Sequence, residues 1–252
     1  AEDADITFRL YKKFQKSLKD EKMINIYEIF EKPLLKILAF MEIEGVKIDN
    51  KFLKSLSTKF EKKIVKIQNE VFKISKKEFN IASPKQLGEI LYNDLKIADL
   101  KKTKKGSFAT SASVLEDLAF KGHKFPQLVL DWRQVSKLKN TYSDSLPEHI
   151  NPNTQRVHTS FLLAATTTGR LASSDPNLQN IPIKSEDGKD IRKAFIAKKD
   201  HVLISADYNQ IEMRILADLA DVKGLKKAFK NNEDIHSLTA SQIFNVDIKK
   251  VN

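Results

Sequence analysis

Apolar residues recur every three or four positions through most of the first 147 residues, which predicts a largely helical region. The clearest helix carries an apolar stripe at Leu53, Leu56, Phe60, Ile64, Ile67, Val71 and Ile74. Asp49 precedes this helix as a predicted N-cap, and Ser83 caps a second helix that has Pro84 at its first position. A possible capping box of Ser113 and Glu116 opens another helix. Further helices are expected over residues 5–20, 34–41 and 128–142.

The pattern changes between Pro147 and Pro152. Beyond these prolines an alternation typical of a strand follows, at Val157, Thr159, Phe161 and Leu163. Short apolar runs predict two further strands, at residues 194–197 and 202–206. Two helices are expected after them, at about 210–220 and about 235–244. The sequence therefore predicts a helical part of about 150 residues followed by an α+β part.

Positive charge is concentrated in one segment of the chain. The 252 residues include 44 Lys and Arg against 33 Asp and Glu, a formal net charge of +11. Residues 51–105 alone hold 15 Lys, no Arg and six acidic residues. This basic segment favours a polyanionic partner, nucleic acid first and an anionic membrane second. Lysine suits contacts to phosphates as a point charge, and a solvated lysine-rich helix surface is the alternative interpretation.

Composition excludes several classes of protein. The absence of cysteine excludes disulfide scaffolds, thiolate zinc sites and cysteine nucleophiles. No apolar run approaches the roughly 20 residues of a membrane span. A helix lying on a membrane surface is disfavoured, because the lysines surround an apolar seam that the core needs. We therefore expect no membrane partner.

The densest polar signal is at residues 207–214. An apolar run ends in Asp207, and a helix is expected two or three residues later. A carboxylate at the end of a buried strand has free oxygens at the edge of the core, which suits a hard cation such as Mg²⁺. Glu212 follows in the first helical turn, so it can face the same cleft. The alternative for Asp207 is a helix cap.

Three other segments carry candidate chemistry. Residues 166–182 are rich in hydroxyls and amides and contain one Arg, groups that can donate to the minor-groove acceptors of every base pair. The alternative is a loop that satisfies its own backbone. His236 starts a helix, where free N–H groups favour an anion such as phosphate, although a surface or capping role is the plainer interpretation. Residues 136–142 are a basic helix end whose alternative is plain solvation.

Together these segments resemble the family A DNA polymerases, the bacterial DNA polymerase I group. Residues 207–214, Asp-Tyr-Asn-Gln-Ile-Glu-Met-Arg, are similar to motif A of that family, usually D-Y-S-Q-I-E-L-R. Residues 168–182 resemble its T-G-R-L-S-S-x-x-P-N-L-Q-N-I-P signature, and residues 234–240 match D-I-H-x-x-T-A. Other matching motifs follow the family's order at residues 31–34, 41–46, 83–87 and 137–142. The departures are mild: Asn209, Met213 and Ala172 replace Ser, Leu and Ser.

The resemblance implies a catalytic site that works with two Mg²⁺ ions. Asp207 would ligate both ions, with the Tyr208 carbonyl on one of them. Glu212 would pack under the incoming sugar and reject a 2′-hydroxyl by its volume. Gln210 and His236 would bind the deoxynucleoside triphosphate with it.

The resemblance also implies contacts to primer–template DNA. Arg170 would touch the minor groove at the primer end and take part in catalysis, and Asn177, Gln179 and Asn180 would lie along template and primer. Further DNA contacts are expected from residues of the basic segment and the helix after it: Lys101, Lys102, Lys104, Lys105, Lys137, Lys139 and Asn140.

The implied fold is α+β, a helical thumb followed by part of an antiparallel-sheet palm in an incomplete right-hand fold. Residues 1–25 are expected to be the end of a 3′–5′ exonuclease domain, and residues 26–50 lead from it into the thumb. Residues 51–147 would form the basic thumb, and residues 148–252 a partial palm with the start of the fingers. Asp3 would be a stranded ligand of the exonuclease site.

We expect this chain to be a fragment of a bacterial, cytoplasmic and nucleoid-associated monomer. The later motifs of the family do not occur in these 252 residues, so the chain should bind DNA weakly and be inactive alone. A non-enzymatic helical module that binds nucleic acid is the alternative.

Overall fold

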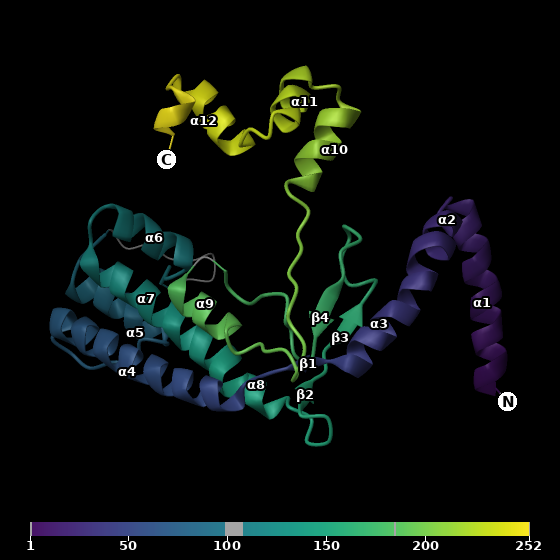
Figure 1. Ribbon diagram of the computed structural model, residues 1–252. Helices are drawn as coiled ribbons and strands as arrows, with labels where there is room; N and C mark the ends of the chain where they lie inside the picture. Colours follow the sequence, from purple (N-terminus) through teal and green to yellow (C-terminus); the bar gives the residue numbers. More distant parts are fainter. Residues whose placement is uncertain (1, 99–107, 184, 252) are drawn as a thin grey trace. The chain divides into compact units, whose positions relative to one another are not determined.

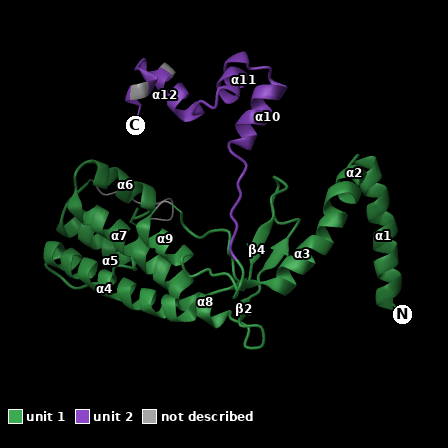
Figure 2. Ribbon diagram, in the orientation of Figure 1, with its two compact units in different colours: residues 1–201 green, residues 202–252 purple. Residues whose placement is uncertain are grey.

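A computed structural model of the chain describes residues 2–98, 108–183 and 185–251. The chain divides into two compact units, Ala1–His201 and Val202–Asn252 (Figure 2). The first unit contains helices α1 to α9 and all the strands of the described residues, and the second contains α10 to α12 (Figure 1). The α+β class is confirmed, with helices predominating over small antiparallel sheets.

The long helix predicted from apolar spacing is α4 (Asn50–Ser75). Leu53, Phe60 and Val71 are completely buried on one of its faces, because residues three and four apart share a side of a helix. The Phe52 amide donates to the Asp49 carboxylate at 2.9 Å, which confirms the predicted cap. The buried face of α4 packs on α7 (Lys124–Leu138), and the two helices belong to one helical bundle (Figure 1).

Shorter helices complete this bundle. They are α5 (Pro84–Gly88), the π-helical turn η2 (Glu89–Asp94), α6 (Ala112–Phe120), the π-helical turn η3 (Lys139–Asp144) and α8 (Ser145–Glu148). The predicted cap Ser83 is confirmed, since its hydroxyl accepts from the Gln86 amide at 3.4 Å. The capping box at Ser113 is wrong, because α6 already starts at Ala112 and its N-cap is Ser111.

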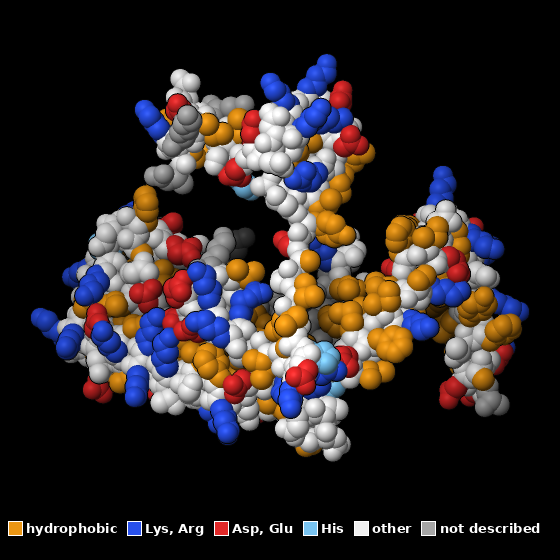
Figure 3. Space-filling model, in the orientation of Figure 1, with side chains coloured by type: hydrophobic (Ala, Val, Ile, Leu, Met, Phe, Trp, Pro, Cys, Tyr) orange, Lys and Arg blue, Asp and Glu red, His pale blue; other side chains and the backbone are white. Residues whose placement is uncertain are grey.

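The N-terminal helices bury little apolar surface. They are α1 (Glu2–Asp20), α2 (Ile24–Ile26), the π-helical turn η1 (Tyr27–Glu31) and α3 (Lys32–Glu44). No residue of α1 is buried, and Leu38 is the buried residue of α3. Apolar side chains gather over α3 and the strands beside it (Figure 3). No helix among the described residues is long and apolar enough to cross a membrane.

The strands of the described residues pair in two small antiparallel sheets. The strands are β1 (Val46–Lys47), β2 (Arg156–Val157), β3 (Ser160–Leu162) and β4 (Ala172–Ser174). Val46 of β1 lies opposite Val157 of β2, and Ser160 of β3 lies opposite Ser174 of β4. The alternation at 157–163 is therefore divided between β2 and β3. The predicted strand at 194–197 contributes a single bridge, between Phe195 and Ile48.

The predicted strand at 202–206 is wrong. This segment has no strand pairing among the described residues, and Val202 and Ile204 are 81% and 87% exposed. An apolar run indicates a tendency to be buried, but a strand also needs a neighbour for its backbone N–H and C=O groups. In the part of the chain that the structure describes, no neighbour hydrogen-bonds to this run.

Two ion pairs connect α4 to α9 (Glu186–Arg192). Lys59 binds Asp190 at 2.6 Å and Lys63 binds Asp187 at 2.5 Å, so the pairs lie one helical turn apart on α4. Hydrogen bonds from Lys193 and Lys59 lower the pKa of Asp190. These pairs connect α4 of the helical bundle to α9, which comes after β4 in the chain.

The Asp190 contribution to stability is expected to depend on pH. Because its folded-state pKa is below the unfolded value of about 3.9, the contribution is complete above about pH 5 and is lost as pH falls through the folded pKa. Asp190→Asn should cost about 0.5–1 kcal/mol of unfolding free energy at pH 7 and progressively less below pH ~4. Urea unfolding followed by Trp132 fluorescence measures this difference. Asp117→Asn, at an exposed position on α6, is the control. An equal loss of unfolding free energy in Asp190→Asn at pH 7 and below pH ~4 would contradict the prediction.

Candidate active site and nucleic-acid interface

Buried hydroxyl groups fix the middle of the polar segment 166–182. The Thr159 hydroxyl lies 2.6 Å from the Ser173 hydroxyl and donates to the Pro176 carbonyl at 2.8 Å. The Leu178 amide in turn donates to the Ser173 hydroxyl at 3.0 Å. Both hydroxyl residues are buried. Part of the segment thus forms hydrogen bonds with its own backbone groups, as the alternative interpretation anticipated. These hydrogen bonds fix the direction of the chain after Ser173.

Apolar and amide residues are interspersed after this turn. Leu178 and Ile181 pack against the core of the first unit, whereas Asn177, Gln179 and Asn180 are exposed. The three residues are therefore exposed on a backbone that is anchored on both sides, and the Asn177 side-chain oxygen accepts from the Gln179 backbone amide at 2.9 Å. We call residues 177–180 the amide row.

Arg170 lies in the loop between β3 and β4. Its side chain is exposed, and its carbonyl accepts a hydrogen bond from the Thr166 hydroxyl at 2.7 Å. Gly169, with a φ of 74°, forms the turn before it. Arg170 and the amide row belong to the same unit and to one continuous segment.

Lys139 is engaged in ion pairs. Its ammonium group lies 2.8 Å from Asp144 and 3.3 Å from Glu61 of α4, and its side chain is 19% exposed. The hydrogen bond to Asp144 raises the pKa of Lys139. Ser57 of α4 donates to the same Asp144 at 2.6 Å. Lys139 therefore holds η3 against α4, whereas its neighbours Lys137 and Asn140 are exposed.

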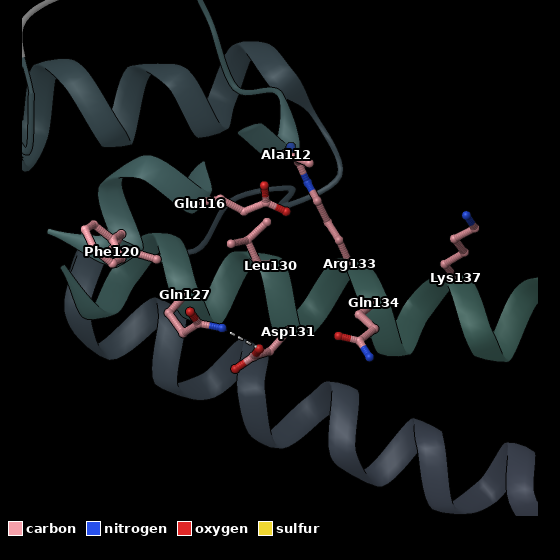
Figure 4. A pocket seen from close by; sticks show the side chains of 10 residues that line it. Ala112, Glu116, Phe120, Gln127, Leu130, Asp131, Arg133, Gln134 and Lys137 are labelled. Carbon is pink, nitrogen blue, oxygen red and sulfur yellow. Dashed lines mark hydrogen bonds between the residues drawn. The ribbon is translucent and has the colours of Figure 1, made fainter. Parts of the chain in front are cut away.

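Lys137 also lines a cavity of about 670 Å³ between α6 and α7. Figure 4 shows Arg133 and Lys137 on α7 together with Glu116 of α6 and Asp131. Because acidic and basic side chains share its wall, this cavity is not a uniformly basic groove. The predicted contacts Lys101, Lys102, Lys104 and Lys105 lie outside the described residues.

The turn before α10 (Ile211–Leu219) carries the predicted metal ligand. Asp207 is exposed and Tyr208 is 82% exposed. The N-cap position of α10 is Gln210, with a φ of 51°, so Asp207 does not cap this helix. Glu212 lies in the first turn of α10, as predicted.

Arg214 holds this turn from the helix side, a role that sequence reasoning missed. Its Nε donates to the Asn209 carbonyl at 2.8 Å, and its guanidinium lies 4.4 Å from the ring centre of Phe229. Phe229 belongs to α11 (Lys223–Lys230). Arginine commonly stacks on aromatic rings in this way, but sequence spacing alone does not identify the ring.

His236 is exposed in the first turn of α12 (Ile235–Phe244). The Asp234 carboxylate accepts from the backbone amides of His236 and Ser237, at 3.2 and 3.3 Å. Hydrogen bonds from the Ser237 hydroxyl and these amides lower the pKa of Asp234. The expectation of free N–H groups beside His236 is therefore wrong, because the cap residue already uses them.

The predicted site residues are divided between the units. Asp207, Tyr208, Gln210, Glu212 and His236 belong to the second unit. The DNA-contact candidates with described positions belong to the first, as does Asp3, which is exposed in the first turn of α1. Within the described residues, no three His, Cys, Asp or Glu side chains come together as a metal site.

A helical bundle with small antiparallel sheets agrees with the α+β fold that the sequence motifs imply. A family model described as DNA polymerase family A matches residues 50–252, and the chain belongs to this family.

Relatives agree along nearly the whole chain. It is 48% identical to DNA polymerase I of Rhizobium leguminosarum, over 99% of this chain and 24% of that protein. It is 50% identical to DNA polymerase I of Caldicellulosiruptor bescii, over 90% of this chain and 26% of that protein. The chain thus spans about a quarter of the length of these curated relatives.

A solved structure has the same fold. It is the POL domain of Pol1 from M. smegmatis in complex with DNA primer-template and dNTP. The two share 37% identity and a TM-score of 0.84, over 94% of this chain and 42% of that one.

Proposed function

We propose that this chain is the DNA-holding and metal-ligating part of a polymerase that performs template-directed deoxynucleotidyl transfer in DNA replication and repair. The observation that carries the proposal is the amide row, three exposed amides on a backbone anchored by Leu178, Ile181 and buried hydroxyls. Membership of family A and the likeness to a polymerase domain solved with primer-template and dNTP support it.

In this proposal the helical residues 51–147 are a thumb that holds the DNA backbone. Residues 26–50 lead into it, residues 148–252 are part of the palm with the start of the fingers, and residues 1–25 end an exonuclease domain that would include Asp3. The whole enzyme acts as a monomer on DNA at the nucleoid, in the cytoplasm of a bacterium.

Arg170 and the amide row contact the minor groove of the primer–template. Their N–H groups are donors, and purine N3 and pyrimidine O2 are acceptors found in every base pair. Such contacts recognise correct pairing geometry whatever the sequence, which suits an enzyme that must copy any template.

Asp207 and the Tyr208 carbonyl are proposed to hold Mg²⁺. Carboxylate and carbonyl oxygens are the donors that this hard ion prefers, so the residues fit the ion in kind. Two ligands are fewer than its six positions, and further ligands come from the triphosphate, from water and from other carboxylates of the enzyme. When bound, such ions assist attack of the primer 3′-OH on the α-phosphate and departure of pyrophosphate.

The remaining residues of the second unit position the nucleotide. Glu212 packs under the sugar and excludes a 2′-hydroxyl by its volume. Gln210 and His236 approach the triphosphate; because Asp234 takes the nearby backbone amides, His236 would act through its ring.

The binding proposal predicts a steep dependence of DNA affinity on salt. If about four phosphates are neutralised, affinity should fall about a hundredfold between 50 and 200 mM salt, because each contact releases counterions. Fluorescence anisotropy of a labelled primer–template with the 252-residue chain measures this slope.

Two neighbouring lysines provide a matched comparison for this measurement. Lys137→Gln should reduce the slope by about one, because Lys137 is exposed. Lys139→Gln should leave the slope unchanged, because Lys139 is paired with Asp144 and Glu61. Salt-independent binding, or equal slopes for wild type and Lys137→Gln, would contradict the assignment. The chain alone is expected not to extend the primer, and robust extension would show that these residues suffice for catalysis.

A further inference from the structure

A buried tyrosine contacts the amide row from the helical bundle. Tyr142 lies in η3, its side chain is 2% exposed, and its ring is part of the core of the first unit. Its hydroxyl shares its one hydrogen between the Asn180 carbonyl oxygen at 2.5 Å and the Asn180 side-chain oxygen at 3.0 Å, a three-centre hydrogen bond. One phenol thus contacts both the backbone and the side chain of a residue 38 positions later.

These two contacts define the orientation of the Asn180 amide. An amide has its acceptor oxygen and its NH₂ donor on opposite sides of one carbon, so an oxygen held by Tyr142 turns both N–H donors away from the core. Burial raises the pKa of Tyr142, so its hydroxyl remains a donor at neutral pH. Asn180 itself is exposed, so its N–H groups are accessible to solvent.

The turn η3, which carries Tyr142, is also held by contacts to α4. Asp144 of η3 accepts from Ser57 of α4 at 2.6 Å and from Lys139 at 2.8 Å, and Lys139 also pairs with Glu61 of α4. A displacement of α4 would therefore move η3, and η3 carries the group that orients Asn180. The Tyr142 hydroxyl is a polar contact between the bundle and the amide row, in addition to the packing of Leu178 and Ile181 on the core.

We propose that Tyr142 is a positioning residue for Asn180: its hydroxyl holds the amide so that the N–H groups donate to a minor-groove acceptor of the bound duplex. The inference rests on the proposed DNA-binding function. It adds that the contact with the groove depends on the position of η3, so the helical bundle influences how base-pair geometry is sensed.

Tyr142→Phe tests this in the 252-residue chain, because it removes the hydroxyl and keeps the ring in the core. The matched control is Tyr92→Phe. Tyr92 is 5% exposed in the same bundle, and its hydroxyl donates to the Ala109 carbonyl at 2.7 Å. Each variant removes one buried hydroxyl that donates a single hydrogen, so their melting temperatures should fall by similar amounts.

Binding is measured by anisotropy on primer–templates in which single adenines near the primer end are replaced by 3-deazaadenine. This base keeps its pairing and lacks the N3 acceptor in the minor groove. For one of the tested positions, the wild-type chain should bind the unmodified duplex about three- to tenfold more tightly than the duplex with 3-deazaadenine at that position. This ratio is the range of a single net hydrogen bond. Tyr142→Phe should lose this preference, and Tyr92→Phe should keep it.

A double-variant cycle separates positioning from general stability. Asn180→Ala should lose the same preference, and adding Tyr142→Phe should cause no further loss of affinity. Additive losses, or a preference that survives in Tyr142→Phe, would refute the inference. A wild-type chain that binds duplex DNA without any N3 preference would refute it as well and leave the proposed function standing. A chain that binds no duplex at all would refute both.

Discussion

Replacing Asp207 by Asn in the complete polymerase proposed above is expected to lower the rate of nucleotide incorporation at least about a thousandfold. The amide is nearly the same size as the carboxylate but is neutral, so it is a poor ligand for Mg²⁺. Stabilisation of transition-state charge by such an ion amounts to several kcal/mol, and about 4 kcal/mol corresponds to a thousandfold in rate. Asp207 is exposed and does not cap α10, so the substitution should leave the fold intact.

Single-turnover primer extension with saturating DNA and nucleotide measures the effect. Asp218→Asn is the control, because Asp218 is an exposed residue of α10 that pairs with Lys226 at 3.0 Å. Its rate should stay within about twofold of wild type, since an exposed ion pair contributes little. Wild-type activity in Asp207→Asn would remove the metal assignment. The alternative of a non-enzymatic module that binds nucleic acid would then gain support.

Local patterns predicted the elements that depend on local physics. The apolar spacing from Leu53 to Val71 gave α4 correctly, because it encodes both the helix and the face that it buries. Asp49 and Ser83 were correct caps for the same reason, since a cap bonds a backbone amide three residues away. Ser111 was not recognised because two serines compete at that position and either can precede the helix.

Contacts between distant residues were not predictable in this way. The run 202–206 has the composition of a strand, but pairing depends on a neighbour that the run itself does not encode. The amide row was identified by its residue types, whereas its link to Tyr142 joins residues 38 apart that share no spacing rule. Likewise Lys139 resembles its exposed neighbour Lys137 in sequence, and only its ion pairs with Glu61 and Asp144 set it apart.

Gly45 is expected to tolerate a single added methyl group poorly, because both its backbone conformation and its surroundings oppose a side chain. It ends α3 with a φ of 60° and a ψ of −169°, a region that is essentially restricted to glycine. A Cβ there would lie 2.6 Å from the Val157 carbonyl oxygen and 2.7 Å from Nδ1 of His158. Gly45→Ala should therefore lower the unfolding free energy by about 4 kcal/mol, about half from backbone strain and half from the steric conflict.

Gly122→Ala separates these two causes. Gly122 also has a positive φ, 91°, but a Cβ there would meet no atom within 4 Å, so its cost is backbone strain alone, about 1–2 kcal/mol. Urea unfolding followed by the fluorescence of Trp132, the single tryptophan and a residue of the first unit, compares the variants. Equal costs would mean that β2 relaxes away from α3. A larger cost at Gly45, together with weaker DNA binding, would show that contact between α3 and β2 supports the strands that lead into the amide row. The connection is through the chain, because Val157 of β2 is followed by Thr159, whose hydroxyl fixes the turn at Ser173.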